Sequence, residues 1–98
     1  MRHFLNLFDV SASELKRLLS DAALLKADVA RGHRPPLLAG QVLGMVFEKP
    51  SLRTRASFEA AMAQLGGSSI FLSPADGRMG HRETVPDFAR TLSSYVDV

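Results

Sequence analysis

Apolar side chains recur at every third or fourth position in the first third of this 98-residue chain, and this spacing predicts an amphipathic helix. The repeating positions are Leu15, Leu18, Leu19, Ala22, Leu25 and Val29. Ser11 followed by Glu14 has the pattern of a capping box and marks the start of the helix. The helix should end near Gly32, because the two prolines of the segment His33–Pro36 cannot continue it.

Short apolar runs in the remainder of the chain predict strands. Val42–Phe47 is apolar at nearly every position, as expected of a strand buried on both faces in a parallel sheet. Ser69–Leu72 is a second, shorter candidate, and Tyr95–Val98 has the composition of the start of a third strand. If these strands are parallel, they need crossover connections between them.

Helical patterns occupy both intervals between the predicted strands. The first should begin around Arg53 or Thr54 and stop at the pair Gly66–Gly67. The second is predicted from about Glu83 to Ser94. This order of elements predicts an α/β fold, a three-layer sandwich in which a parallel sheet carries helices on both faces.

Two polar segments, 48–55 and 73–82, follow the first two predicted strands. The carboxyl ends of parallel strands meet at one edge of a sheet, where open α/β folds bind their ligands. We therefore expect the two segments to contribute to one site. The chain stops on a strand without a following helix, so we expect it to be a fragment of a longer protein.

Composition and charge narrow the class of protein. Hydrophobic residues make up 46% and charged residues 22%, which is typical of one small folded domain. A net charge of +2 is too small to indicate a nucleic-acid partner, and no segment has the pattern of a signal peptide or a membrane span. The absence of cysteine is compatible with a cytoplasmic protein, and the three histidines lack metal-like spacing.

The junction between the first strand and the next helix concentrates groups that bind anions. It holds one ammonium, two hydroxyls and two guanidiniums, those of Lys49, Ser51, Thr54, Arg53 and Arg55. A helix that starts there directs free backbone N–H groups outward at the positive end of its dipole. Singly, Ser51 and Thr54 could only satisfy local backbone groups, and the arginines could be solvated surface. Together they favour a phosphate site.

The sequence of this junction also resembles that of a known family. Ser51–Glu59 reads Ser-Leu-Arg-Thr-Arg-Ala-Ser-Phe-Glu. It is similar to the phosphate loop of the aspartate/ornithine carbamoyltransferase superfamily, Ser-Thr-Arg-Thr-Arg followed by an apolar residue and Ser-Phe-Glu. Ala61–Gly67, Gly80–Thr84 and Asp87–Leu92 resemble further segments of that family, so the resemblance covers nearly the whole chain.

The resemblance implies a role for each residue of the loop. Ser51, Arg53 and Thr54, with the backbone amide of Leu52, would hold the phosphate of carbamoyl phosphate. Arg53 would be the catalytic residue, because its permanent charge stabilises the phosphate that leaves as the carbamoyl group is transferred. Arg55 is as well suited to brace the loop or a subunit contact as to touch the ligand.

The second polar segment, 73–82, reaches into a neighbouring subunit's site in this family. Arg78 is the candidate ligand-binding residue by position, and His81 is the alternative. The same resemblance implies a homotrimer that works without a metal or an organic cofactor.

The acceptor amine is less constrained by this part of the sequence. Phe47–Pro50 looks more like the ornithine enzymes, which implies a role in arginine metabolism, and aspartate enzymes usually show Phe-Glu-Pro there. Leu52 replaces the commonest threonine and resembles the acetylated-ornithine enzymes, which keeps that acceptor open. The ornithine-binding domain would lie beyond Val98, so the chain alone should be inactive. A non-catalytic anion-binding or assembly module is the alternative.

Overall fold

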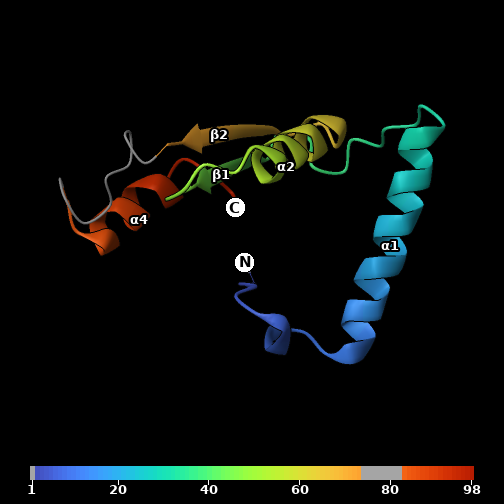
Figure 1. Ribbon diagram of the computed structural model, residues 1–98, viewed down its shortest axis with the longest axis horizontal. Helices are drawn as coiled ribbons and strands as arrows, with labels where there is room; N and C mark the ends of the chain where they lie inside the picture. The colour runs from blue at the N-terminus through green and yellow to red at the C-terminus, as the bar shows by residue number, and fades with distance from the viewer. Residues whose placement is uncertain (1, 74–82) are drawn as a thin grey trace. The chain divides into compact units, whose positions relative to one another are not determined.

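The computed structural model describes residues 2–73 and 83–98 and contains five longer elements and one short helix in these ranges (Figure 1). The chain divides into two compact units, Met1–Arg34 and Pro35–Val98. The first unit holds a 3₁₀-helix, η1 (Leu7–Asp9), and helix α1 (Ala12–Ala30). The second unit holds β1 (Val42–Val46), α2 (Leu52–Gln64), β2 (Ser68–Leu72) and α4 (Val85–Ser93).

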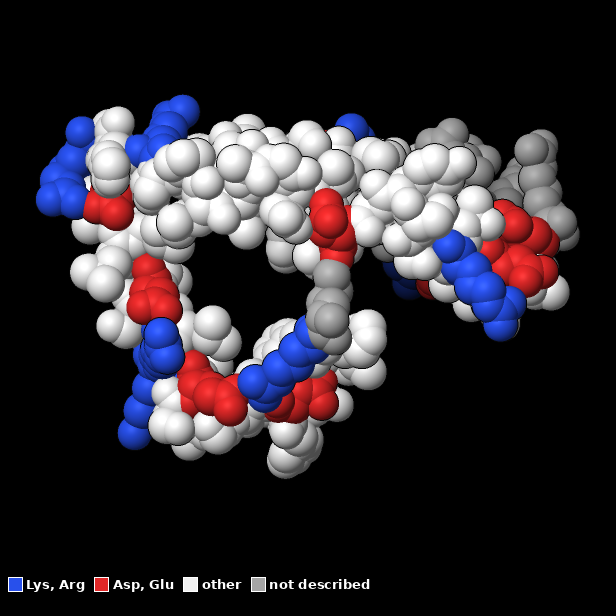
Figure 2. All heavy atoms as spheres, turned by 180° about the vertical axis from the view of Figure 1, so that it is seen from behind, with Lys and Arg blue, Asp and Glu red and all other residues white. Residues whose placement is uncertain are grey.

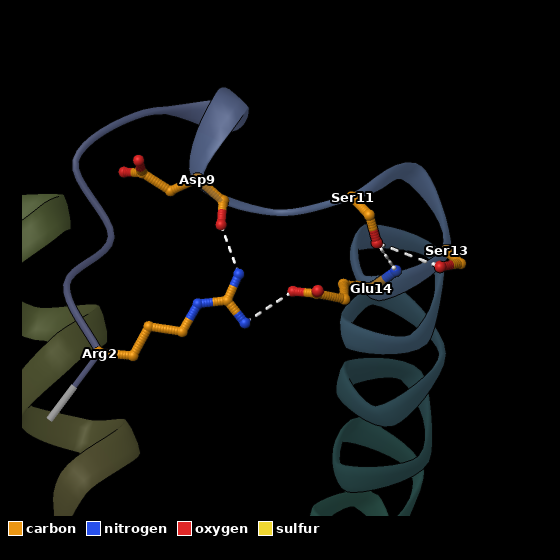
Figure 3. A network of polar contacts seen from close by, with 5 residues as sticks. All are labelled: Arg2, Asp9, Ser11, Ser13 and Glu14. Atoms are coloured by element: carbon orange, nitrogen blue, oxygen red, sulfur yellow. Dashed lines mark hydrogen bonds and ion pairs between the residues drawn. The ribbon is translucent and has the colours of Figure 1, made fainter.

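Helix α1 begins where the sequence predicted. Ser11 is its N-cap, and the Ser11 Oγ accepts the backbone N–H of Glu14 at 3.1 Å. The carboxylate of Glu14 is paired with the guanidinium of Arg2 at 2.8 Å, so it is engaged by the N-terminal segment (Figure 3). The cap is therefore confirmed, and the glutamate of the expected capping box has a different partner.

A capping box that was not predicted from the sequence lies at the start of η1, just before α1. The Asp9 carboxylate accepts the N–H groups of Leu5 at 2.6 Å and of Asn6 at 3.1 Å, and Asn6 Oδ1 accepts the Phe8 N–H at 2.8 Å. The bond from Leu5, and then the one from Asn6, lowers the pKa of Asp9 below its usual value. Arg2 contributes least, because it donates to the Asp9 carbonyl oxygen while the carboxylate points away from it (Figure 3).

The second unit is built on a parallel pair of strands. β1 and β2 pair in register from Val42 opposite Ser68 to Val46 opposite Leu72. Residues 96–98 begin to pair with the other edge of β1, because the Gly44 N–H donates to the Val98 carbonyl at 2.7 Å. The predicted α/β class with a parallel sheet is therefore confirmed, and the chain reaches the position expected of a third strand.

Element boundaries differ from the predicted ones by one or two residues. α2 starts at Leu52, one residue earlier than predicted, and β1 ends at Val46 rather than Phe47. α4 starts two residues later, at Val85, because Thr84 is its N-cap and accepts the Asp87 N–H at 3.2 Å. These shifts do not change which elements flank the polar segments.

Few apolar side chains are buried in the described residues. Met45 of β1 and Met62 of α2 are the buried hydrophobic ones, with exposed fractions of 4% and 9%. α2 packs against β2, and Met62 is the buried side chain of this helix.

The surface of the first unit carries neighbouring charges of opposite sign. Ion pairs join Arg17 to Asp21 and Arg31 to Asp28 along α1. Figure 2 shows such blue and red neighbours along this unit, and a mostly uncharged surface over the sheet of the second unit. No helix in residues 2–73 and 83–98 is both long and apolar enough to span a bilayer.

Gly66 ends α2, and its replacement gives a test of how tightly the helix end is packed. Its φ of +85° is strained for any side chain, and an added Cβ would lie 3.1 Å from Pro36 Cβ. Gly40 has a similar φ of +78° with nothing within 4 Å, so Gly40→Ala is the matched control. Both substitutions should cost about 1–2 kcal/mol of backbone strain, and Gly66→Ala at least about 1 kcal/mol more from crowding.

The free energy of unfolding in urea measures both variants. Equal losses for Gly66→Ala and Gly40→Ala would contradict the packing of Gly66 against Pro36.

Candidate anion-binding site

The carboxyl ends of β1 and β2 lie side by side. Val46 is opposite Leu72 in the register, and the Phe47 N–H donates to the Leu72 carbonyl at 3.4 Å. The segment after β1 therefore leaves the sheet next to Ser73, where the segment after β2 begins. Residues 74–82 lie outside the described part of the chain, and so do the predictions made for Arg78 and His81.

The N-terminus of α2 is not capped by the side chain in the N-cap position. Ser51 occupies that position but makes no capping hydrogen bond, and its hydroxyl donates to Thr54 Oγ1 at 2.9 Å. The interpretation of the Ser51 hydroxyl as a plain helix cap is therefore wrong. The N–H groups of Leu52 and Arg53 have no acceptor among the described residues, and they stand at the positive end of the helix dipole.

The other two α-helices that the structure describes begin differently. Ser11 caps α1 and Thr84 caps α4, each with its hydroxyl oxygen on a first-turn N–H. Both helices also carry a carboxylate in the first turn, Glu14 and Asp87, whereas α2 has no acidic residue there. A first-turn carboxylate offsets the positive end of the dipole, so α2 alone of these three keeps that potential for an external anion.

Arg53 is exposed in the first turn of α2, and its guanidinium has no carboxylate partner among the described residues. Five arginines in the described ranges form ion pairs with carboxylates: Arg2, Arg17, Arg31, Arg55 and Arg90. Arg53 makes no hydrogen bond or ion pair with any described residue, and the same holds for Arg34. Lys49, also exposed and without an ion pair in these ranges, adds a second cation to the segment that leads into the helix. A phosphate would meet a free guanidinium here.

Arg55, in contrast, is held by its neighbours. Its Nε–H donates to Glu59 Oε1 at 3.0 Å, one helical turn further along α2. Its guanidinium carbon also lies 3.7 Å from the centre of the Phe71 ring on β2. The two arginines of the loop therefore differ: Arg53 has no partner in residues 2–73 and 83–98, whereas Arg55 is held against the sheet.

The sequence analysis missed the partners of Arg55. The spacing of four residues to Glu59 is a signal for a helical ion pair and could have been read from the sequence. The contact with Phe71 had no local signal, because it depends on how α2 packs against β2.

The assembled groups suit a tetrahedral anion. Two hydroxyls within 2.9 Å of each other, free first-turn N–H groups and an unpaired guanidinium all belong to Ser51–Thr54. In residues 2–73 and 83–98, no group of three or more His, Asp or Glu side chains could hold a metal ion. The groups of Ser51–Thr54 themselves supply hydrogen-bond donors and positive charge.

Comparison with known proteins gives the family. The family described as "Aspartate/ornithine carbamoyltransferase, carbamoyl-P binding domain" matches residues 2–98. The chain belongs to this family. The resemblance of its residues 51–59 to this family is thereby confirmed.

Similar proteins cover the whole chain but extend well beyond it. The ornithine carbamoyltransferase of Halorhodospira halophila is 55% identical over 97 residues, which are 99% of this chain and 32% of that protein. The crystal structure of the ornithine carbamoyltransferase of Pyrococcus furiosus matches 98% of this chain and 31% of its own at 45% identity, with a TM-score of 0.93. The catalytic subunit of M. jannaschii aspartate transcarbamoylase matches 99% of this chain and 32% of its own at 33% identity, with a TM-score of 0.85.

Leu52 provides a test of how the loop binds an anion. Its side chain is 80% exposed and offers no donor, so only its N–H is available. Leu52→Thr should strengthen binding of inorganic phosphate by about threefold to tenfold, the effect of one added hydroxyl hydrogen bond. Leu52→Val, which has the shape of threonine without the hydroxyl, is the control and should bind like the original chain.

Isothermal titration calorimetry gives the dissociation constants. A gain shared by the threonine and valine variants would show that shape, not the hydroxyl, changed the affinity.

Proposed function

We propose that this chain is the carbamoyl-phosphate-binding part of an ornithine carbamoyltransferase. The enzyme would transfer the carbamoyl group from carbamoyl phosphate to the side-chain amine of ornithine, giving citrulline and phosphate. The observation that carries the proposal is the start of α2, which has no side-chain cap and carries in its first turn Arg53, an arginine without an ion pair in the described part of the chain; the family is described by its carbamoyl-phosphate-binding domain.

Each group of the loop has a role that its position supports. The first-turn N–H groups and the hydroxyls of Ser51 and Thr54 would orient the phosphate oxygens. Arg53 would place a guanidinium on the same oxygens. As the amine attacks the carbonyl carbon, the bond from that carbon to the bridging oxygen breaks and charge grows on the departing phosphate. Donors fixed at that position lower the barrier because they interact more strongly with the leaving phosphate than with the bound substrate.

The second polar segment would complete this site. By family resemblance Arg78, or alternatively His81, would supply a further donor from segment 73–82. Arg55 is not assigned to the ligand, because Glu59 and Phe71 engage it in the structure.

The acceptor and the remainder of the enzyme belong to a second domain. This chain spans about a third of the length of the curated relatives that it matches. Residues 1–98 would form part of the carbamoyl-phosphate domain, and an ornithine-binding domain would follow in the whole protein. The resemblance also supports a homotrimer in the cytoplasm that serves arginine metabolism, without a metal or an organic cofactor.

Ornithine is favoured over other acceptors by two observations. Phe47–Pro50 has the lysine that is common in the ornithine enzymes, and the relatives of highest identity named above are ornithine carbamoyltransferases. Aspartate and N-acetylornithine are the alternative acceptors, because an aspartate transcarbamoylase shares the fold and Leu52 resembles the acetylated-ornithine enzymes.

Replacement of Arg53 tests the loop directly. Arg53→Ala should weaken binding of carbamoyl phosphate and of inorganic phosphate by about tenfold to a hundredfold, the effect of one charge-assisted hydrogen-bonding group. Arg34→Ala is the matched control, because Arg34 is the other described arginine without an ion pair and lies outside the loop. Isothermal titration calorimetry with each ligand measures the two variants.

Equal affinities of the two variants would contradict the assignment of the loop. Association of the chain in sedimentation experiments, with no heat from either ligand, would favour the assembly module instead. Turnover can be measured in a chimera that carries this chain in place of the N-terminal third of the Halorhodospira halophila relative, where Arg53→Ala should abolish transfer.

A further inference from the structure

One aromatic ring contacts both sides of the phosphate loop. Phe71 is the last residue but one of β2, and the guanidinium carbon of Arg55 lies over its ring, 3.7 Å from the ring centre. The same ring packs edge-to-face with Phe47, with centroids 5.4 Å apart and planes at 87°. Phe47 is the last residue before the exposed segment 48–51, and Arg55 lies in the turn of helix that follows it.

The loop between these two contacts has few other connections to the sheet. Residues 48–51 are exposed. Among the described residues, one backbone hydrogen bond lies at each boundary of the loop: the Phe47 N–H donates to the Leu72 carbonyl, and the Arg55 N–H donates to the Ser51 carbonyl. The direction of the first turn of α2 therefore depends on how its base is held against β2.

Arginine is well matched to this position. Its planar guanidinium can stack on an aromatic face and donate in its own plane to a carboxylate at the same time. Arg55 does both, because Glu59 accepts from its Nε in the plane while Phe71 lies under it. Glu59 also compensates the charge of Arg55. Arg53 has no such partner among the described residues, so its positive charge remains available to an anion.

We propose that Arg55 is a positioning residue, which with Phe71 sets the direction of the Arg53 side chain and of the first-turn N–H groups toward the phosphate without touching it. This inference rests on the proposed function, because it concerns the same loop. It adds that Phe71, a residue of β2 with no charge, controls the affinity for the anion through Arg55.

A double-mutant cycle tests the proposal in the full 98-residue chain. Arg55→Met and Phe71→Leu should each weaken inorganic phosphate binding by about tenfold, equivalent to ~1.4 kcal/mol. The double variant should also lose about tenfold rather than about a hundredfold, because both residues act through one contact. Arg17→Met removes an arginine that is ion-paired on α1 and should change nothing, which makes it the control.

Arg55→Lys is a second variant that leaves the ring in place. It retains the charge but lacks the planar guanidinium, so it should recover only part of the affinity lost in Arg55→Met. Calorimetry measures each dissociation constant, and circular dichroism confirms that the helices of each variant are retained.

Three results would overturn the positioning role. One is a Phe71→Leu chain with unchanged affinity, which would mean that the contact between Arg55 and the ring does not influence binding. The others are losses that multiply in the double variant and full affinity in Arg55→Lys. Arg53→Ala separates this failure from failure of the proposed function: if it weakens binding while Arg55→Met does not, only the positioning role is wrong.

Discussion

The parallel, in-register pairing of β1 with β2 is the constraint on which the site depends. It brings the ends of both strands to one edge, with Val46 opposite Leu72, and so fixes where both polar segments begin. It also places Phe71 on the strand beside β1, where the ring meets Phe47 and the first turn of α2. A slip of one residue would turn Phe71 to the other face of the sheet and remove both contacts.

The start of α2 combines local features that favour an external anion. A hydroxyl cap and a first-turn carboxylate stabilise the other two described α-helices, whereas α2 has neither. The helix therefore gives up stabilisation that a cap would supply, about 0.5–2 kcal/mol. A bound phosphate would accept hydrogen bonds from the same N–H groups and from Arg53. Binding would therefore supply the stabilisation that a side-chain cap gives to the other two helices. Loss of local stability at a binding site is common among functional residues.

The sequence predicted elements whose signals are local and missed features that depend on packing. Ser11 located the start of α1, and Gly66 located the end of α2, because caps and positive-φ glycines act within a few residues. The orientation of the Ser51 hydroxyl could not be predicted. A serine that caps the helix and a serine that donates to Thr54 stand in the same sequence pattern. The contact between Arg55 and Phe71 could not be predicted either, because it needs the register of the sheet. The motif predicts a phosphate site in the loop, and the structure supplies the geometry on which that proposal rests.

Residue-resolved NMR can decide whether the N-terminus of α2 binds phosphate. Inorganic phosphate is titrated into ¹⁵N-labelled chain while every backbone amide is followed. Binding at this helix end should give saturable shifts for the amides of Leu52, Arg53 and Thr54, with little change at Glu14, whose N–H is already bonded to Ser11. Shifts that are equal at α1 and α2, or absent from α2, would contradict it.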